Sequence, residues 1–375
     1  MRVPHNLPPL VGRELEYIAD ALKSRRLSGD GPYTQRCQNW LTALTGGTSR
    51  LTHSCTGALE MAAILSEVQP GDEVIMPSFT FASTANAFAL RGAVPVFVDV
   101  QRDTLNISPE KIEEAITSLS KVIVVVRYAG VCAEMQKIKA IADGHGLLVI
   151  EDAAHALCSA YNGRPAGALG AMACFSFHET KNVIAGEGGA IIINDPRLVE
   201  RADIIGEKGT NRVAFRQRRV DKYTWVDIGS SYLPSEIVAA ALWAQLDAAW
   251  EITSTRLQLW ERYHQAFLIL EQTERALRPL VPENCSHNGH IYYLLLRDRA
   301  RRDELISKLS ADGIHAPFHY IPLHSAPAGR RYGKVSGTLD VTDHVSECLI
   351  RLPLFVELGR DQGLIIDRVL KHLMV

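Results

Sequence analysis

Two residues with reactive side chains each follow an apolar run in the middle of the chain. Asp152 ends the run 147–152, and Lys181 comes shortly after the run 173–177, ahead of the glycine-rich segment 186–189. Short, continuous apolar runs are typical of parallel strands that are buried on both faces of a sheet. Ligands bind at the carboxyl ends of such strands, so we expect the carboxylate and the amine to face one crevice.

This pair of groups is the one that pyridoxal 5'-phosphate (PLP) requires. A lysine amine forms a Schiff base with the aldehyde of the cofactor, and an aspartate keeps the pyridine nitrogen protonated, so that the ring accepts electrons from a carbanion. Lys181 and Asp152 are the candidates for these two roles.

The phosphate and the ring of such a cofactor need partners as well. The segment 52–60 reads as a loop that runs into a helix, and its Thr56 and Gly57 lie where first-turn amides and a hydroxyl form an anion site. Ser176 is a further donor, and Phe81 offers a ring that can stack on the cofactor.

Each of these residues also has an ordinary structural explanation. Asp152 could cap the helix that follows it, Lys181 could be a solvated loop lysine, Thr56 could be an N-cap without a ligand, and Phe81 could belong to the core. Taken singly, each residue favours the structural explanation. Taken together and in this order, they favour the cofactor site.

The elements that must position these residues belong to an α/β domain. Helix candidates at about 56–68, 82–90, 109–118 and 134–145 alternate with the apolar runs, and each is long enough for a crossover between parallel strands. The apolar runs lie at 73–76, 94–98, 121–126, 147–150, 173–177 and 190–193.

The pattern changes in the last third of the chain. A long helical stretch at about 234–277 is followed by a strand at 291–296, a helix at 302–309, a short strand near 314–318 and a terminal helix that ends at 375. We therefore predict two domains: a cofactor-binding α/β domain with an N-terminal arm over 1–250, and a smaller α+β domain over 251–375.

Composition narrows the class of protein. The chain has 375 residues, 47% of them hydrophobic, and its formal net charge of −2 gives no basic field for nucleic acid. No apolar run approaches the ~20 residues of a membrane helix. The first residues lack the apolar core of a signal peptide, and seven Cys without any C-x-x-C pair suggest neither a disulfide framework nor a thiolate zinc site. We expect a cytoplasmic protein.

Several segments together resemble a known family. They are SCTGAL at 54–59, PGDEVI at 70–75, PSFTF at 77–81, EDAAH at 151–155 and SFHETK at 176–181. They are similar to the DegT-type sugar-nucleotide aminotransferases, which are PLP enzymes of fold type I, and the similarity extends over essentially the whole chain. YTW at 223–225, DIGSSYLPS at 227–235 and FHYIPLH at 318–324 look like the branch that aminates C4 of dTDP-4-keto-6-deoxyglucose.

The resemblance implies a fold, a reaction and partners. The fold would be a mostly parallel seven-stranded sheet in the large domain with a smaller α+β C-terminal domain. The reaction would transfer an amino group, with glutamate as the expected donor, to the nucleotide sugar, giving dTDP-4-amino-4,6-dideoxygalactose. Another 3-keto or 4-keto nucleotide sugar is the alternative substrate. Family members are homodimers with shared active sites.

The resemblance also assigns residue roles. Lys181 would be the Schiff-base lysine, Asp152 the pyridine partner and Phe81 the stacking ring. The phosphate would be held by Thr56, Gly57 and Ser176, with Ser231 reaching it from the partner subunit, and His155 would lie near the ring oxygen of the cofactor. The residues expected on the substrate side are Arg127, Glu187, His319, Tyr320 and His324.

Other interpretations stay open or are disfavoured. A nucleotide-binding oxidoreductase needs G-x-G-x-x-G after an early strand, which the chain lacks. A non-catalytic sensor would not need the intact aspartate and lysine. Prolines at 317 and 322 break any helix that could align the histidines at 315, 319 and 324, so we expect no metal site. The basic segment 212–222 is either a solvated loop or a sleeve for a nucleotide diphosphate.

Overall fold

The structure is a computed structural model that describes residues 3–374. Its largest element is an eight-stranded sheet with the order β1-β9-β8-β5-β4-β2-β3-β13. All neighbours pair in parallel from β8 to β13, while β9 is antiparallel to both β8 and β1. The strands are β1 (Thr48–Thr52), β2 (Glu73–Pro77), β3 (Val94–Val98), β4 (Ser120–Val126), β5 (Leu148–Asp152), β8 (Met172–Ser176), β9 (Gly189–Ile193) and β13 (Lys334–Val335).

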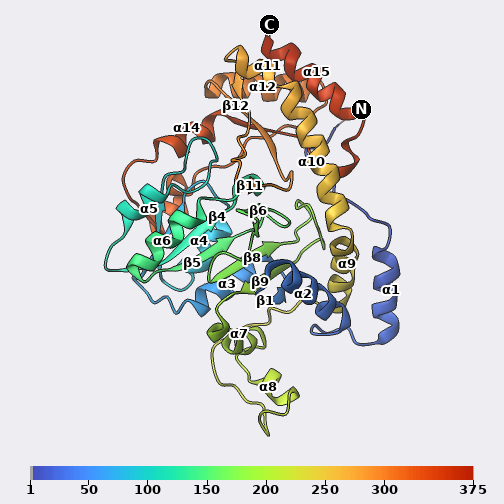
Figure 1. Cartoon of the computed structure of the whole chain (residues 1–375), viewed down its shortest axis with the longest axis vertical. Coiled ribbons are helices and arrows are strands. Elements are labelled where there is room, and N and C mark those ends of the chain that lie inside the picture. Colours follow the sequence, from blue (N-terminus) through green and yellow to red (C-terminus); the bar gives the residue numbers. More distant parts are fainter. Residues whose placement is uncertain (1–2, 375) are drawn as a thin grey trace.

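Helices cover both faces of this sheet (Figure 1), as the fully buried central strands require. One hydrophobic core joins the sheet to α1 (Glu14–Ser24), α2 (Pro32–Thr45), α5 (Pro109–Ala115), α6 (Met135–His145) and α9 (Glu236–Asp247). A second core, on the other face, contains α3 (Cys55–Leu65), α4 (Ala82–Ala89) and α7 (Val199–Gly206).

A smaller α+β unit is built on a separate core. Its antiparallel sheet consists of β10 (Ala276–Leu277), β12 (Tyr292–Leu296) and β14 (Leu349–Leu352). Its helices are α10 (Ala249–Ala266), α11 (Leu268–Gln272), α12 (Arg299–Ala311), α14 (Asp340–Cys348) and α15 (Asp361–Met374). In Figure 1 α10 rises from the end of α9, so this helix pair links the two units.

Short elements complete the chain. A small sheet contains β6 (Ala160–Tyr161), β7 (Arg164–Pro165) and β11 (Cys285–Ser286), and the remaining helices are α8 (Arg212–Arg216) and α13 (Pro327–Tyr332). The 3-10 turns are η1 (Tyr128–Gly130), η2 (Pro196–Leu198), η3 (Leu323–Ser325) and η4 (Val356–Leu358). Over the described residues, no helix is long and apolar enough to cross a membrane.

The two units exchange segments in both directions. Near the N-terminus, the amide of Val3 donates to the Gly313 carbonyl at 2.8 Å, and the amide of His315 donates to the Val3 carbonyl at 3.0 Å. In the opposite direction, β13 adds to the edge of the large sheet beside β3. The division at residue 250 stays a prediction, and these crossings show that the two units are interlocked.

The secondary structure differs from the sequence expectation in three places. The sheet has an eighth, two-residue strand, β13, which is too short for periodicity to reveal. The long helix expected over 234–277 is divided into α9, α10 and α11, because the backbone leaves helical geometry at Ala248 and Phe267. The strand expected near 314–318 is reduced to single bridges at Ile314 and Phe318.

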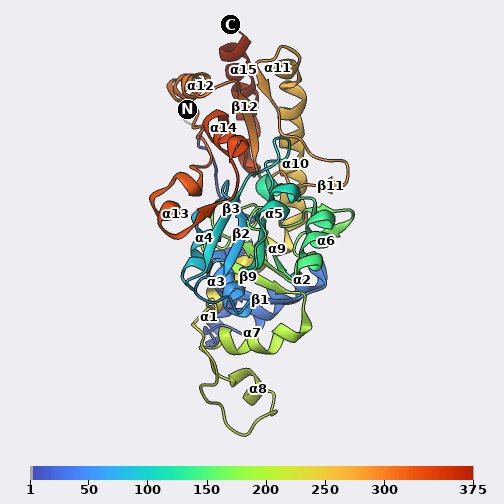
Figure 2. The same ribbon diagram turned by 90° about the vertical axis from the view of Figure 1, so that its left-hand side faces the viewer.

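The segment from α7 to residue 232 forms an arm. It carries α8 and projects away from the body of the molecule in both Figure 1 and Figure 2. Several large apolar side chains on this arm are exposed, and Trp225 is the most exposed at 76%. The others are Phe215, Tyr223, Val226 and Ile228.

Candidate active site

A cavity of about 500 Å³ opens at the carboxyl ends of the central strands. The register places Asp152 of β5 opposite Val126 of β4 and Cys174 of β8, so the loops that follow these strands meet at one edge of the sheet. The cavity walls come from both units and from the N-terminal segment. They include His5, Asn6, Ser54, Cys55, Thr56, Thr80, Phe81, Ser83, Asp152, Ala154, His155, Ser176, His178, Thr180, Lys181, Glu187, His290, His319, Tyr320 and Arg351.

Asp152 is fixed at the base of the cavity. The Thr84 hydroxyl donates to its Oδ2 at 2.7 Å, and the Ala154 amide donates to its Oδ1 at 3.2 Å. Burial raises the pKa of this carboxyl, while these two donors and the Lys181 ammonium act in the opposite direction. A buried carboxylate in this setting favours a cationic or N–H partner in the cavity.

Lys181 lies in a tight turn that leaves β8. Its amide donates to the His178 carbonyl at 2.9 Å, and the amide of Ala185 returns to the Phe177 carbonyl at 2.7 Å. Burial lowers the pKa of the Lys181 amine to about 8, because the charged form loses solvation there. Among residues 3–374 its side chain has no hydrogen-bonded acceptor, so the amine is available for chemistry.

The N-terminus of α3 supplies donors at the far end of the cavity. Ser54 caps the helix by accepting the Gly57 amide at 3.0 Å, which leaves the Cys55 and Thr56 amides without an acceptor in the described chain. A Cβ at Gly189 would lie 2.3 Å from the Ser54 carbonyl carbon, so only glycine lets β9 press this close to the helix start. The result is an anion site at a helix N-terminus.

Hydroxyl groups extend this anion site. Thr56 Oγ1 lies 2.7 Å from Ser83 Oγ, and Ser176 is nearly buried at the end of β8. Phe81, at the start of α4, is 63% exposed at the cavity mouth, so its ring has no protein partner on its open side. An aromatic face in this position is suited to stacking on a planar ligand.

A wall of aromatic and imidazole rings closes the opposite side. The rings of His155 and His290 have centroids 4.4 Å apart, the Tyr320 hydroxyl lies 3.5 Å from His155 Nε2, and the Tyr128 hydroxyl lies 3.0 Å from His319 Nδ1. Burial lowers the pKa of His155, His290 and His319, so these imidazoles are neutral near pH 7. The Nδ1 atom of His155 is buried without a hydrogen-bond partner, which indicates room for a ligand group beside it.

Sequence reasoning missed several residues of the cavity, four of which come from the small unit and the N-terminal segment. Arg351 lies on β14 of the small unit, His290 precedes β12, and His5 and Asn6 belong to the N-terminal segment. Each comes from a segment far from the central motifs, and none stands in a local pattern that marks a site. The Arg351 guanidinium forms no ion pair within residues 3–374, and its Nε is buried without a partner.

Two residues expected on the substrate side do not line the cavity. Arg127 is fully buried, and its Nε donates to Glu151 Oε2 at 2.7 Å beneath the sheet edge. His324 instead lies with its Nδ1 2.8 Å from Ser78 Oγ and its Nε2 3.3 Å from Asp343 Oδ1. Both side chains are engaged by the protein, so we correct their assignment as substrate ligands of this cavity.

Of three further expected site residues, two lie outside the cavity and one lies at its edge. Gly57 does not line the cavity, and its amide is already taken by Ser54. Ser231 is exposed on the arm, outside the cavity of its own chain. Glu187 is at the cavity edge, with Oε1 3.6 Å from His178 Nε2. Among the described residues, no cluster of His, Cys, Asp or Glu could hold a metal ion.

The donor set fits PLP. The Lys181 amine suits its aldehyde, the buried Asp152 carboxylate suits its pyridine nitrogen, and the helix N-terminus with Thr56 and Ser176 suits its phosphate. The unpartnered His155 Nδ1 leaves space for a polar atom of the ring. This site on this sheet defines a PLP-dependent enzyme of fold type I.

Comparison with known proteins identifies the family. Residues 9–373 match the DegT/DnrJ/EryC1/StrS aminotransferase family, and the chain belongs to it. It is 31% identical to the spore coat polysaccharide biosynthesis protein SpsC of Bacillus subtilis, over 96% of this chain and 94% of that one.

Solved structures agree with this assignment. The aminotransferase TlmJ from Streptoalloteichus hindustanus is 29% identical and superposes with a TM-score of 0.89, covering 100% of this chain and 98% of that chain. Spr1654 of Streptococcus pneumoniae, assigned as a sugar aminotransferase and solved in a PLP-form, is 25% identical with a TM-score of 0.91, covering 100% and 99%. This chain is therefore a PLP-dependent sugar aminotransferase.

Proposed function

We propose that this enzyme transfers an amino group from L-glutamate to the C4 keto group of a dTDP-4-keto-6-deoxyhexose, giving dTDP-4-amino-4,6-dideoxygalactose. The observation that carries the amino transfer is the convergence of Lys181 and Asp152 on one cavity that also presents an unpaired arginine. The sugar and its C4 position are supported by the segments 223–235 and 318–324, which resemble the branch that makes this product.

Different parts of the active site would contribute different steps of the amino transfer. PLP, when bound, supplies an electron sink and an aldehyde that carries the amino group. Asp152 would keep a proton at the pyridine nitrogen of that cofactor, and the α3 N-terminus would hold its phosphate. Lys181, with its pKa lowered to about 8, can both accept and return a proton near neutral pH.

The amino donor has a matching cation in the cavity. Arg351 approaches from the small unit with its guanidinium unpaired within residues 3–374, and a planar guanidinium pairs bidentately with a carboxylate. We assign it to a carboxylate of glutamate. His319 and Tyr320 remain on the substrate side, where they present one imidazole and one phenol to the sugar.

A homodimer is part of the same proposal. The arm exposes several large apolar side chains, Trp225 most of all, and such surfaces are typical of protein–protein contacts. Ser231 lies on the same arm and does not line the cavity of its own chain. A second copy of the chain would cover the arm and place Ser231 at the neighbouring phosphate. The cytoplasmic compartment stays a prediction of the composition.

Replacing Lys181 by alanine tests the catalytic assignment. We expect the purified variant to lose both the visible absorbance of the lysine-linked cofactor and all turnover, because no other amine lines the cavity within the described chain. Lys139→Ala, at an exposed position on α6, is the matched control and should keep both. Full absorbance and turnover in the Lys181 variant would refute the role.

A substrate panel tests the sugar. The enzyme is loaded with PLP and glutamate, then given 3-keto and 4-keto-6-deoxy nucleotide sugars, and each product is identified by NMR. We expect amination at C4 with retention of the thymidine diphosphate group. Preferential amination at C3, or of another nucleotide, would replace the proposed substrate while leaving the aminotransferase assignment intact.

A further inference from the structure

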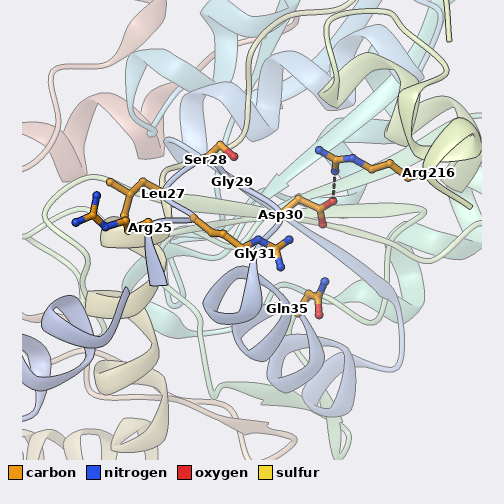
Figure 3. A pocket seen from close by; sticks show the side chains of 9 residues that line it. Arg25, Leu27, Ser28, Gly29, Asp30, Gly31, Gln35 and Arg216 are labelled. Carbon is orange, nitrogen blue, oxygen red and sulfur yellow. Dashed lines mark hydrogen bonds and ion pairs between the residues drawn. The ribbon is translucent and has the colours of Figure 1, made fainter. Parts of the chain in front are cut away.

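The molecule has a second cavity, of about 610 Å³, between the α1–α2 connection and α8 of the arm (Figure 3). Arg25 and Arg26 line it, and its third arginine, Arg216, pairs with Asp30. Part of its wall is the arm, which the proposed homodimer places against the partner subunit. This cavity therefore belongs with that contact rather than with a separate ligand.

His290 lines the active-site cavity, but none of the binding or catalytic roles assigned to that site falls to it. It precedes β12, it is 5% exposed, and its ring centroid lies 4.4 Å from that of His155. Its carbonyl accepts a hydrogen bond from Arg256 Nη2 at 2.8 Å, and its Nδ1 lies 2.8 Å from Oδ1 of Asn182, the residue after Lys181. The imidazole is therefore held at its backbone and at its ring, next to the lysine loop.

The hydrogen bonds around this ring determine which of its nitrogen atoms carries the proton. Asn182 Nδ2 donates to the backbone carbonyl of Asn288 at 2.9 Å, and because a carbonyl can only accept, this bond fixes the orientation of the Asn182 amide. The Oδ1 atom of Asn182 then faces His290 Nδ1 and is also an acceptor, so Nδ1 must be the donor. The neutral ring consequently has its lone pair at Nε2.

Nε2 is the free acceptor of His290. It has no hydrogen-bond partner among residues 3–374 and is not sealed off by protein atoms, so it is open to the cavity. Burial lowers the pKa of His290 well below its usual 6.5, and neighbouring groups, including Lys181 and Arg351, act in the same direction. The ring thus stays neutral near pH 7, where it accepts hydrogen bonds but is a poor base.

The two substrates of amino transfer differ in what they can offer to this nitrogen. Glutamate has an amino group, whose nitrogen goes to the cofactor, and two carboxylates, which near neutral pH are acceptors only. A lone pair at Nε2 disfavours such a carboxylate, whereas each hydroxyl group of a sugar has a proton to donate. We propose that His290 Nε2 accepts a hydrogen bond from a hydroxyl group of the sugar and thereby selects the sugar substrate.

The position of His290 indicates which hydroxyl group this is. Its partner Asn182 directly follows Lys181, the residue that acts at the reacting carbon. The hydroxyl group therefore lies on the carbon next to the keto carbon. For the 4-keto-6-deoxyhexose of the proposed function, on which this step rests, it is the hydroxyl at C3, because C5 bears the ring oxygen and no hydroxyl.

The protonation of the ring is measured without any substrate. In the PLP-saturated enzyme labelled with ¹⁵N-histidine, long-range ¹H–¹⁵N spectra show whether each ring nitrogen is protonated, and the signals missing from His290→Asn identify this residue. We expect a proton on Nδ1 and none on Nε2 from pH 6 to 8. A proton on Nε2, or on both nitrogen atoms, would overturn the proposal.

Kinetics of the same variant test the contact with the sugar. An asparagine amide can keep the hydrogen bond to Asn182 through its own nitrogen, but it removes the acceptor at Nε2. We expect His290→Asn to raise the KM for the keto sugar about 10-fold, which corresponds to the loss of one hydrogen bond, and to keep the glutamate half-reaction and the visible cofactor absorbance. His145→Asn, at the exposed end of α6, is the matched control and should change none of these.

The comparison of half-reactions separates a sugar contact from other roles of His290. An unchanged KM for the keto sugar, or a larger effect on glutamate than on the sugar, would overturn the proposal. An equal loss in both half-reactions would do the same, because it is the result expected of a contact with Lys181 or of a purely structural role.

Substrate analogues locate the hydroxyl group with the parent enzyme, so this test does not depend on the folding of a variant. The KM for the 3-deoxy form of the keto sugar should be about 10-fold higher than for the 2-deoxy form, and His290→Asn should lose this difference. If the parent enzyme does not aminate the 4-keto sugar, the proposed function fails, and the deoxy forms of the sugar that it does aminate take their place. A parent enzyme that is indifferent to the hydroxyl beside the keto carbon would refute the role of His290.

Discussion

At the scale of single residues, the chemistry depends on which side chains in the cavity are charged and on how burial shifts their pKa values. Burial lowers the pKa of the Lys181 amine and raises the pKa of the Asp152 carboxyl, so the two pKa values move toward each other. The neutral imidazoles of His155 and His319 add polar surface without adding charge. Arg351 is thereby the main fixed cation available to an acidic substrate.

The lowered pKa of Lys181 predicts the pH dependence of cofactor uptake. Attack on the PLP aldehyde needs the neutral amine, so the rate of reconstitution of the apoenzyme should rise with pH through a midpoint near 8, well below the usual 10.5. The free energy of unfolding of the apoenzyme should also rise between these two values, because the unfolded chain binds more protons there. Stopped-flow absorbance from pH 6 to 10 checks the rate, and a midpoint above 10 would contradict it.

Replacing Arg351 by glutamine should weaken glutamate specifically. Loss of hydrogen bonds between charged groups corresponds to about a 10- to 100-fold increase in the KM for glutamate, with little change in the affinity for PLP. The matched control is Arg330→Gln, which removes an exposed guanidinium from α13. Steady-state kinetics with varied glutamate decides this, and an unchanged KM would remove Arg351 from the donor site.

At the scale of elements, buried amides tie the reactive loops together. Asn288 donates through Nδ2 to the carbonyls of His155 and Leu157, both at 2.8 Å, and its own carbonyl accepts Asn182 Nδ2 at 2.9 Å. Asn182 follows Lys181, and its Oδ1 lies 2.8 Å from His290 Nδ1. The loops after β5 and β8 are therefore held by the segment that leads into β12.

We expect Asn288→Ala to destabilise the protein by about 1–3 kcal/mol, because it leaves two buried carbonyl groups without donors. The variant should also lose PLP faster, since the lysine loop and the Asp152 loop are no longer linked. Urea unfolding and the rate of cofactor release measure the two effects. Asn284→Ala, at an exposed position nearby, is the control, and equal stability of the two variants would refute the linking role.

At the scale of the whole molecule, the active site lies where separate parts of the chain meet. The large sheet supplies Lys181 and Asp152, the small unit supplies Arg351 and His319, and the N-terminal segment adds His5. The pairing of Val3 with Ile314 holds that segment against the small unit. The arm extends away from this body in Figure 2. Its large apolar side chains are exposed.

This shape predicts that the arm holds a dimer together. Trp225→Asp places a charge in the proposed contact and should convert the dimer to a monomer near 41.4 kDa, with loss of turnover. Trp250→Asp alters an exposed tryptophan of α10 and serves as the control. Multi-angle light scattering measures the mass, and a fully active monomeric parent enzyme would rule out shared sites.

The sequence located the centre of the site but not its margins. Asp152, Thr56, Ser176 and Lys181 stand at strand ends and at a helix start, where local pattern and chemistry coincide, and the structure brings all four to one cavity. Arg127 also follows a strand, yet its side chain turns to Glu151. Which side of a strand end a residue faces depends on neighbouring strands, so spacing alone cannot decide it.

The sequence by itself determined the family, the cofactor and the mostly parallel sheet, because these depend on contiguous motifs and on apolar runs that mark buried strands. The tertiary structure alone decided that Arg351, His290 and His5 join the cavity and that Arg25, Arg26 and Arg216 surround a second one. Those residues come from segments far apart in the chain, and only packing of the units against each other sets their distances.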